Sequence, residues 1–151
     1  MKLIWFVSAV LIILIISLIL LFAGKNNKPG SNLKEIEIGA SRFYVKIADT
    51  NLKKAKGLSG KEFLAKNQGM LFTYQSLVIP KFWMKGMIIG IDIIWIKENE
   101  VVEISKNITP QNLPFPKTVS PKSKVDSVLE ISAGEADRLG IKPGDKVSLN
   151  H

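Results

Sequence analysis

The first 23 residues of the chain differ from the rest in their pattern of hydrophobic and polar positions. Residues 3–23 are apolar except for Ser8 and Ser17. As a helix, this run would be roughly 31 Å long, which matches the hydrocarbon core of a bilayer. A cleaved signal peptide has a shorter apolar region and small residues before its cleavage site, whereas this run is long and has Leu21 at the −3 position of the candidate site. We therefore expect residues 1–23 to be an uncleaved transmembrane anchor.

The charges beside this apolar run do not by themselves fix its orientation. One lysine and the amino terminus precede the run, and three lysines follow it closely. Single N-terminal anchors with a basic residue ahead of them mostly leave the following domain outside the cytoplasm, and we expect that orientation here. Residues 24–32 have no apolar side chain except Pro29, which predicts a flexible tether. Residues 33–151 then form the globular domain of a single-pass membrane protein.

Short stretches of the globular domain alternate polar and apolar residues, which is the period of half-buried strands. Turn residues at 39–41 and 97–100 separate two pairs of these stretches and predict two hairpins. Residues 110–121 hold four of the seven prolines and predict a stiff extended loop. The expected strands are 34–38, 42–48, 69–74, 80–84, 91–96, 101–108, 127–131 and 146–149, and the expected helices are 51–58, with one more turn at 61–65, and 133–139. The pattern predicts a mainly β (α+β), compact barrel-like domain of seven to eight short strands with two short helices.

The composition of the chain excludes several kinds of catalytic chemistry. It has no cysteine, and its one histidine is the C-terminal residue, His151. A disulfide framework, a thiol nucleophile and a cysteine-ligated zinc are therefore excluded. A Ser–His–Asp triad and a histidine metal site have no support either. We expect no metal and no cofactor, and we favour a non-catalytic function over an enzymatic one.

The net charge points to a class of partner. Residues 25–151 carry 20 basic and 13 acidic side chains. Such a surface attracts anionic lipid headgroups, anionic polymers or nucleic acid, although lysines that are merely solvated give the same composition. Only two of the basic residues are arginine, the side chain that phosphate recognition favours, which argues against nucleic acid. Four lysines with no acidic residue among them lie in or beside the proline-rich loop: Lys106, Lys117, Lys122 and Lys124.

A cluster of aromatic and sulfur side chains is a second candidate site. Trp83 and Lys85 belong to the run Phe-Trp-Met-Lys, and Trp95 follows in the next expected strand. These side chains could pack in the core. They could also form a stacking wall for a sugar or another flat ligand, because tryptophan combines an apolar face with a polar edge.

Three acidic residues lie in apolar surroundings, where a carboxylate is costly unless it is paired or hydrogen-bonded. In the functional interpretation, carboxylates from this set face one cleft and act as the catalytic groups of a glycan hydrolase. Each also has a structural alternative. Asp49 could cap the following helix, Asp92 could bind backbone amides in a loop, and Glu130 could alternate onto the solvent face of its strand.

The order of short motifs along the domain resembles the domain-of-unknown-function 192 (DUF192) family from about Ile36 to Leu149. The motifs are Ala48-Asp49-Thr50, Gly57-Leu58-Ser59-Gly60-Lys61, Gly69-Met70-Leu71-Phe72, Phe82-Trp83-Met84-Lys85, Ile91-Asp92-Ile93-Ile94, Val128-Leu129-Glu130, Ala133-Gly134 and Gly140-Ile141-Lys142-Pro143-Gly144-Asp145. The resemblance implies a small, mainly β domain, often behind a signal peptide or anchor, and it supplies no reaction or cofactor. The family usually has an Asn-Thr or Asn-Met pair after the residue matching Lys85, and a proline further on. This chain has Gly86-Met87 and then Gly90, so an amide contact to a shared ligand would be lost.

These observations favour a binding module of the cell envelope, tethered to the membrane and facing outward, for anionic polymers or lipids. The alternative is a carboxylate-dependent hydrolase of envelope glycans, with Asp49, Asp92 and Glu130 as its candidate catalytic residues. A purely structural or assembly-assisting subunit is a third possibility. The expected ligand-binding residues are Trp83, Lys85, Trp95, Lys106, Lys117, Lys122 and Lys124.

Overall fold

The computed structural model of the chain describes residues 32–110 and 118–150. The expected anchor at 1–23, nearly all of the expected tether and Lys117 lie outside the described residues. Within the described ranges, no helix has the length and the apolar composition needed to span a membrane.

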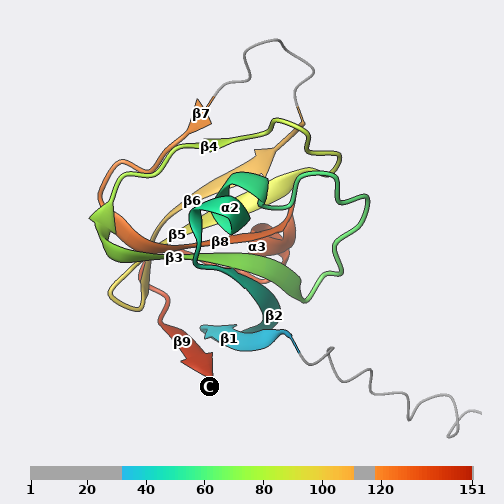
Figure 1. The fold of residues 1–151 in the computed structure, drawn as a ribbon. Coiled ribbons are helices and arrows are strands. Elements are labelled where there is room, and N and C mark those ends of the chain that lie inside the picture. Colours follow the sequence, from blue (N-terminus) through green and yellow to red (C-terminus); the bar gives the residue numbers. More distant parts are fainter. Residues whose placement is uncertain (1–31, 111–117, 151) are drawn as a thin grey trace, which may run out of the picture. The chain divides into compact units, whose positions relative to one another are not determined.

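The described residues form a mainly β domain with two short helices (Figure 1). Seven strands make one sheet in the order β6-β5-β8-β3-β2-β1-β9, and β4 and β7 pair as a separate two-stranded ribbon. The strands are β1 Lys34–Ile38, β2 Ser41–Ala48, β3 Gln68–Val78, β4 Phe82–Trp83, β5 Ile91–Lys97, β6 Glu100–Ile108, β7 Thr118–Val119, β8 Val125–Ser132 and β9 Val147–Asn150. The helices are α2 Asn51–Lys56 and α3 Glu135–Arg138.

Both expected hairpins are confirmed. Strands β1 and β2 pair antiparallel, and so do β5 and β6. The second hairpin turns at Glu98 and Asn99, whose φ angles of 51° and 62° lie in the left-handed region. Two consecutive residues of this kind give a tight turn whose twist matches that of the flanking strands.

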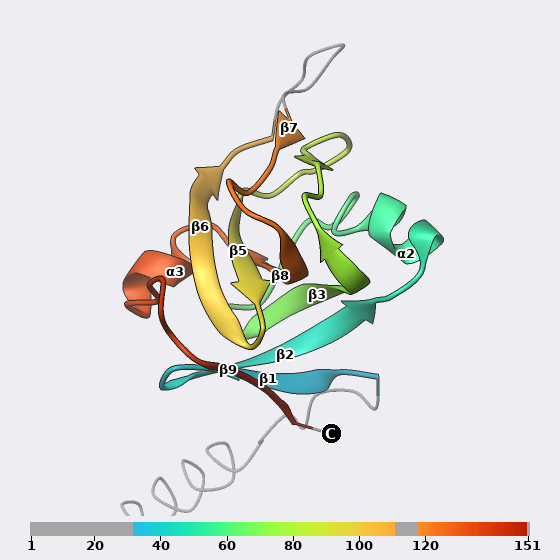
Figure 2. The same ribbon diagram turned by 90° about the vertical axis from the view of Figure 1, so that its left-hand side faces the viewer.

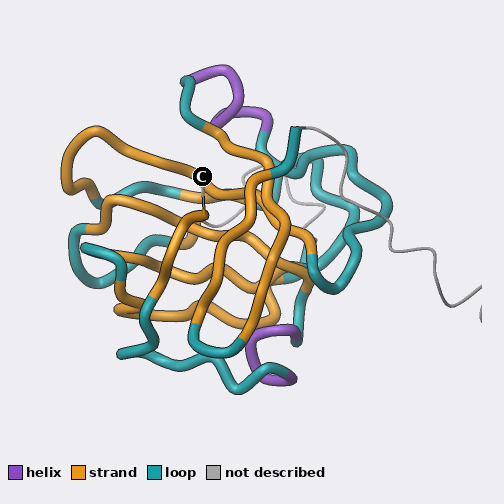
Figure 3. Tube along the Cα trace, turned by 90° about the horizontal axis from the view of Figure 1, so that it is seen from below, coloured by secondary structure: helices purple, strands orange, loops and turns teal. Residues whose placement is uncertain are grey.

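The two edge strands of the seven-stranded sheet, β6 and β9, approach each other where β6 begins. Glu100, at the start of β6, forms an isolated bridge with Lys146, just before β9. The backbone N–H of Val147 donates to the carbonyl of Asn99 at 2.9 Å. The sheet therefore curves into a half-barrel, which Figures 2 and 3 show from two directions. The coarse prediction of a barrel-like β fold is confirmed.

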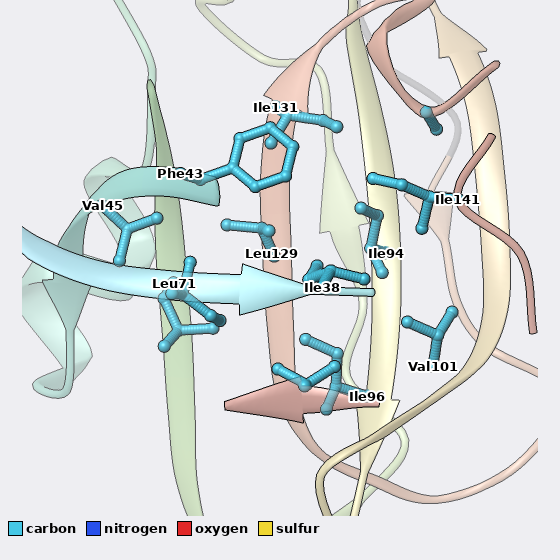
Figure 4. Packing of buried hydrophobic residues seen from close by; sticks show 13 residues of the cluster. Ile38, Phe43, Val45, Leu71, Ile94, Ile96, Val101, Leu129, Ile131 and Ile141 are labelled. Carbon is cyan, nitrogen blue, oxygen red and sulfur yellow. The ribbon is translucent and has the colours of Figure 1, made fainter. Parts of the chain in front are cut away.

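Both faces of the central strands are buried. The first hydrophobic cluster takes residues from all seven strands of the sheet and fills the inside of the half-barrel (Figure 4). The second cluster covers the outer face of β3, β8 and β5, where Leu58 and Met84 from connecting segments pack onto the sheet. Along β8, Leu129 belongs to the first cluster and Val128 to the second. Because side chains alternate along a strand, Glu130 faces the second cluster.

The connection between β2 and β3 supplies part of this outer layer. The two strands pair in parallel, so the chain has to cross over between them. The crossover begins with α2, whose N-cap Thr50 accepts a hydrogen bond from the backbone N–H of Lys53 at 3.3 Å. Helix α2 ends at the C-cap Gly57, with a φ of 49°, so it is two residues shorter than the sequence pattern predicts.

The expected helical turn at 61–65 is wrong. The hydroxyl of Ser132 donates to the carbonyl of Leu64 at 3.1 Å, and the N–H of Gly60 donates to the carbonyl of Gly86 at 2.8 Å. These backbone groups bind other parts of the domain, and the segment lies as an irregular layer over the sheet.

Candidate functional site

A cavity of about 370 Å³ opens over the outer face of the sheet. Its walls come from the end of α2 and the turn after it, from β3, and from β4 with its flanking residues. The lining residues are Lys54, Ala55, Lys56, Gly57, Leu58, Ser59, Phe72, Tyr74, Lys81, Phe82, Trp83, Lys85, Met87, Thr118 and Glu130. Among the described residues, Glu130 is the one carboxylate in this lining.

The Oε2 atom of the Glu130 carboxyl group is buried and lacks a hydrogen-bond partner among the described residues. The residue is 5% exposed, and its Oε2 atom makes no hydrogen bond within the described structure. Its neighbours across the sheet are apolar: Met70 on β3 and Ile93 on β5. Gly57 lies close to this carboxyl group, since a Cβ atom at that position would be 3.9 Å from Oε2. A buried polar group without a partner is costly, and it is rare in a folded domain.

The surroundings of Glu130 change its acidity. Burial raises the pKa of Glu130 from 4.5 to about 8, because an apolar environment disfavours the charged form. Burial, followed by the charge of Glu130, also raises the pKa of Tyr74. The carboxyl is therefore mostly protonated at neutral pH. A carboxyl in a cavity with a strongly shifted pKa is a typical feature of functional sites.

The aromatic residues of the predicted cluster divide between the core and the cavity. Trp95 is fully buried, and its Nε1 donates to the hydroxyl of Ser105 at 3.0 Å. Phe82 packs edge-on against both Phe72 and Trp95, with ring centroids 4.9 and 5.5 Å apart. Trp83 is 54% exposed and lines the cavity. The core-packing interpretation therefore holds for Trp95, whereas the position of Trp83 suits a stacking surface.

Four lysines line the cavity together with these rings: Lys54, Lys56, Lys81 and Lys85. The Nζ atom of Lys54 lies 4.1 Å from the centroid of the Tyr74 ring, and that of Lys85 lies 5.9 Å from the Trp83 ring. These positions are within the range of cation–π attraction. The cavity therefore combines a neutral acid at its floor with positive charge along its walls.

Asp92 lies on the other face of the sheet and has a structural role. It pairs with Ile131, a residue of the first cluster, and it is fully buried. Its two carboxylate oxygens accept hydrogen bonds from the backbone N–H groups of Asn107, at 2.7 Å, and Ala136, at 2.9 Å. The expected binding of backbone amides is confirmed.

The structural alternatives expected for Asp49, a helix cap, and for Glu130, a solvent-facing position, are both wrong. Asp49 is exposed at the start of the crossover and pairs with the Nζ atom of Lys53 at 2.8 Å, so Thr50 caps the helix instead. The solvent-face interpretation of Glu130 is also wrong, because the crossover covers that face of β8. Of the three predicted carboxylates, Glu130 alone lines the cavity, and the structure brings no two of them together there.

The predicted basic stretch lies elsewhere on the surface. Lys106 pairs with Asp137 at 2.5 Å, and Lys122 and Lys124 are exposed. Lys106 and Lys122 border a shallow depression together with Lys142. None of these described lysines lines the Glu130 cavity. No group of three or more potential metal ligands occurs in the described ranges.

Sequence reasoning missed several residues of the cavity. Lys54, Lys56 and Lys81 were not singled out as binding residues, nor was Tyr74. Their signal is weak, because lysines on a short helix are normally solvated. Two local signals did identify residues of the cavity: the acidic residue within the apolar run Val-Leu-Glu-Ile, which is Glu130, and the run Phe-Trp-Met-Lys, which contains Trp83 and Lys85.

These features define a small β half-barrel domain with an aromatic, lysine-lined cavity around one buried glutamate. The sequence matches the DUF192 family, described as "Uncharacterized ACR, COG1430", over residues 34–149, and the chain belongs to that family. In this chain, Met87 of the departing Gly86-Met87 pair lines the cavity. Gly86 stands where that family pair has its asparagine, whereas Met87 matches the Asn-Met form of the pair.

Two solved structures share this fold. One is a protein of unknown function from Novosphingobium aromaticivorans DSM 12444, with a TM-score of 0.72 and 31% identity, covering 80% of this chain and 89% of that one. The other is a putative transcription regulator from Sinorhizobium meliloti 1021, with a TM-score of 0.72 and 24% identity, covering 78% of this chain and 93% of that one. The second likeness shows the fold alone. No curated protein matches this chain.

Proposed function

We propose that this chain is a non-catalytic binding domain for an anionic polymer of the cell envelope, and that one acidic sugar unit of the polymer enters the Glu130 cavity. The observation that carries this proposal is the convergence of four lysines and an exposed tryptophan on one cavity. Lysine ammonium groups attract carboxylate or phosphate groups, and the indole face of Trp83 suits the apolar face of a sugar ring. The cavity volume lies within the range usual for small-ligand sites.

The geometry gives less support to the other interpretations. Glycan hydrolysis by two carboxylates needs both groups on one cleft. Among the described residues, the lining of this cavity holds Glu130 alone. An anionic lipid headgroup would use the same lysines, so lipid binding is the competing outcome of the experiment below.

Replacing the four cavity lysines is expected to weaken binding of an acidic oligosaccharide. The variant is Lys54→Gln, Lys56→Gln, Lys81→Gln and Lys85→Gln in the full-length chain, kept in detergent micelles. Because each exposed ion pair is worth a fraction of a kcal/mol up to about 1 kcal/mol, the affinity for trigalacturonate should fall roughly tenfold or more. Isothermal titration calorimetry measures this change, and circular dichroism checks that the variant is folded.

A matched control carries the same change of charge away from the cavity: Lys106→Gln, Lys122→Gln, Lys124→Gln and Lys142→Gln. We expect this control to bind almost as tightly as the unmodified chain. A larger loss in the control would move the site to the basic stretch predicted from sequence. Binding to phosphatidylglycerol nanodiscs but not to trigalacturonate would replace the polymer with a lipid.

We also propose that residues 1–23 anchor the domain and leave it outside the cytoplasm. The support is the length of the apolar run and the unfavourable cleavage position described above. In cells with a permeabilised outer envelope and an intact cytoplasmic membrane, added protease should digest the domain. Mature protein that starts near Gly24 and is released into the medium would contradict the anchor.

A further inference from the structure

The floor of the cavity holds a buried carboxyl oxygen that makes no hydrogen bond within the described residues. The Oε2 atom of Glu130 is buried, points toward Gly57 and lacks a partner within the described residues. The residue lies between the apolar cross-strand neighbours Met70 and Ile93. A protonated carboxyl has one O–H donor, whereas an ionised one can only accept. The protonation state therefore decides which ligand atoms can bind here.

Several charged or titratable groups share the cavity with this carboxyl, and none of those described is an acid. They are Lys54 and Lys56 from α2, Tyr74 from β3, and Lys81 and Lys85 from the residues on either side of β4. The ring face of Tyr74 is already occupied by the ammonium of Lys54, at 4.1 Å. A cationic ligand would meet four like charges, so the arrangement favours a ligand with anionic oxygens.

We propose that Glu130 acts in recognition as a neutral carboxylic acid and donates its hydrogen to a carboxylate oxygen of the bound acidic sugar. This inference rests on the proposed function and names the ligand group that enters deepest into the cavity. The lysines bind the same anion from the walls, and Glu130 supplies a donor at the floor. An ionised Glu130 would instead place a negative charge against the ligand.

The proposal predicts that binding weakens on the alkaline side of neutrality. With the pKa of Glu130 at about 8, the donor is mostly present at pH 7 and mostly absent at pH 9. If only the protonated form binds, the affinity for trigalacturonate should be about tenfold weaker at pH 9 than at pH 7. Tyr74 does not titrate across this range, because burial raises its pKa from a usual value that already lies near 10. The carboxylates of the probe stay ionised throughout.

Two variants of the full-length chain isolate the role of Glu130. Glu130→Gln keeps an N–H donor that does not titrate, so its affinity should stay close to the pH 7 value of the unmodified chain at every pH. Glu130→Met has a similar volume without a donor, so it should bind about tenfold more weakly at pH 7 and show no pH dependence. Calorimetric titrations at pH 6, 7, 8 and 9 measure all three proteins.

The outcomes separate this inference from the proposed function. A pH dependence that persists in Glu130→Gln would overturn the inference, since another group would then be titrating. Binding that needs the cavity lysines but is flat with pH in the unmodified chain would also overturn it and leave the proposed function standing. Absence of trigalacturonate binding at every pH would overturn both.

Discussion

Glu130→Gln is expected to remove a pH dependence of about 5 kcal/mol from the free energy of unfolding. Burial raises the pKa of Glu130 from 4.5 to about 8, so the folded chain holds this proton to a higher pH than the unfolded chain does. Below pH 4.5 both states are protonated, and above pH 8 both are ionised. Between these limits stability falls as the pH rises, because ionisation lowers the free energy of the unfolded state while the folded state keeps its proton. Glutamine does not titrate, so the variant lacks this loss.

Chemical unfolding of the full-length chain at pH 5, 6, 7 and 8, followed by circular dichroism, measures the effect. The difference in unfolding free energy between the variant and the unmodified chain should move in favour of the variant by about 1.4 kcal/mol per pH unit. Taking the difference cancels the other carboxylates. Glu62→Gln, at an exposed position, is the matched control and should give a constant difference. A constant difference for Glu130→Gln as well would show that the carboxyl is not held protonated.

Asp92→Ala is expected to destabilise the domain by about 2–4 kcal/mol. The substitution leaves two backbone donors without a partner, the N–H groups of Asn107 and Ala136, and each such loss costs about 1–3 kcal/mol. These two bonds join β5 to the bulged part of β6 and to the start of α3. Asp92→Asn retains one acceptor oxygen and should lose about half as much.

Urea unfolding measures this loss, and the binding titration provides an independent test of the role. Asp92 lies on the face of the sheet opposite the cavity, so the folded fraction of Asp92→Ala should bind trigalacturonate with unchanged affinity. A variant that keeps its stability and loses binding would assign Asp92 to the site instead.

The expected helices show which features local sequence patterns can predict and which they cannot. Thr50 begins α2 because its side chain satisfies a free N–H group within the same turn, and that is a local interaction. Residues 61–65, expected as one more helical turn, have no helix in the structure. The hydroxyl of Ser132 binds the carbonyl of Leu64 there, a contact across 68 residues of sequence. A partner that distant leaves no local trace.

Some residues of the candidate site could be predicted from the sequence, but the division of the two tryptophans between cavity and core could not. An acid within the apolar run of β8 is conspicuous in sequence, and so is the pair Trp83 and Lys85. The separation of Trp83 from Trp95 was not predictable, because both residues lie in apolar segments. One of them faces the cavity, and the other packs between β6 and the ring of Phe82.

The sequence by itself determined the mainly β class, the two hairpins and the alternation along β8 that sets Glu130 on the face opposite Leu129. All of these follow from side-chain periodicity and from turn residues within a few positions of each other. Only the tertiary structure decided that the Glu130 face is covered, because the parallel pairing of β2 and β3 carries the crossover over it. The same crossover and the β4 ribbon bring lysines from separate segments around one carboxyl. Burial raises the pKa of that carboxyl, and burial depends on contacts between residues that are far apart in the chain.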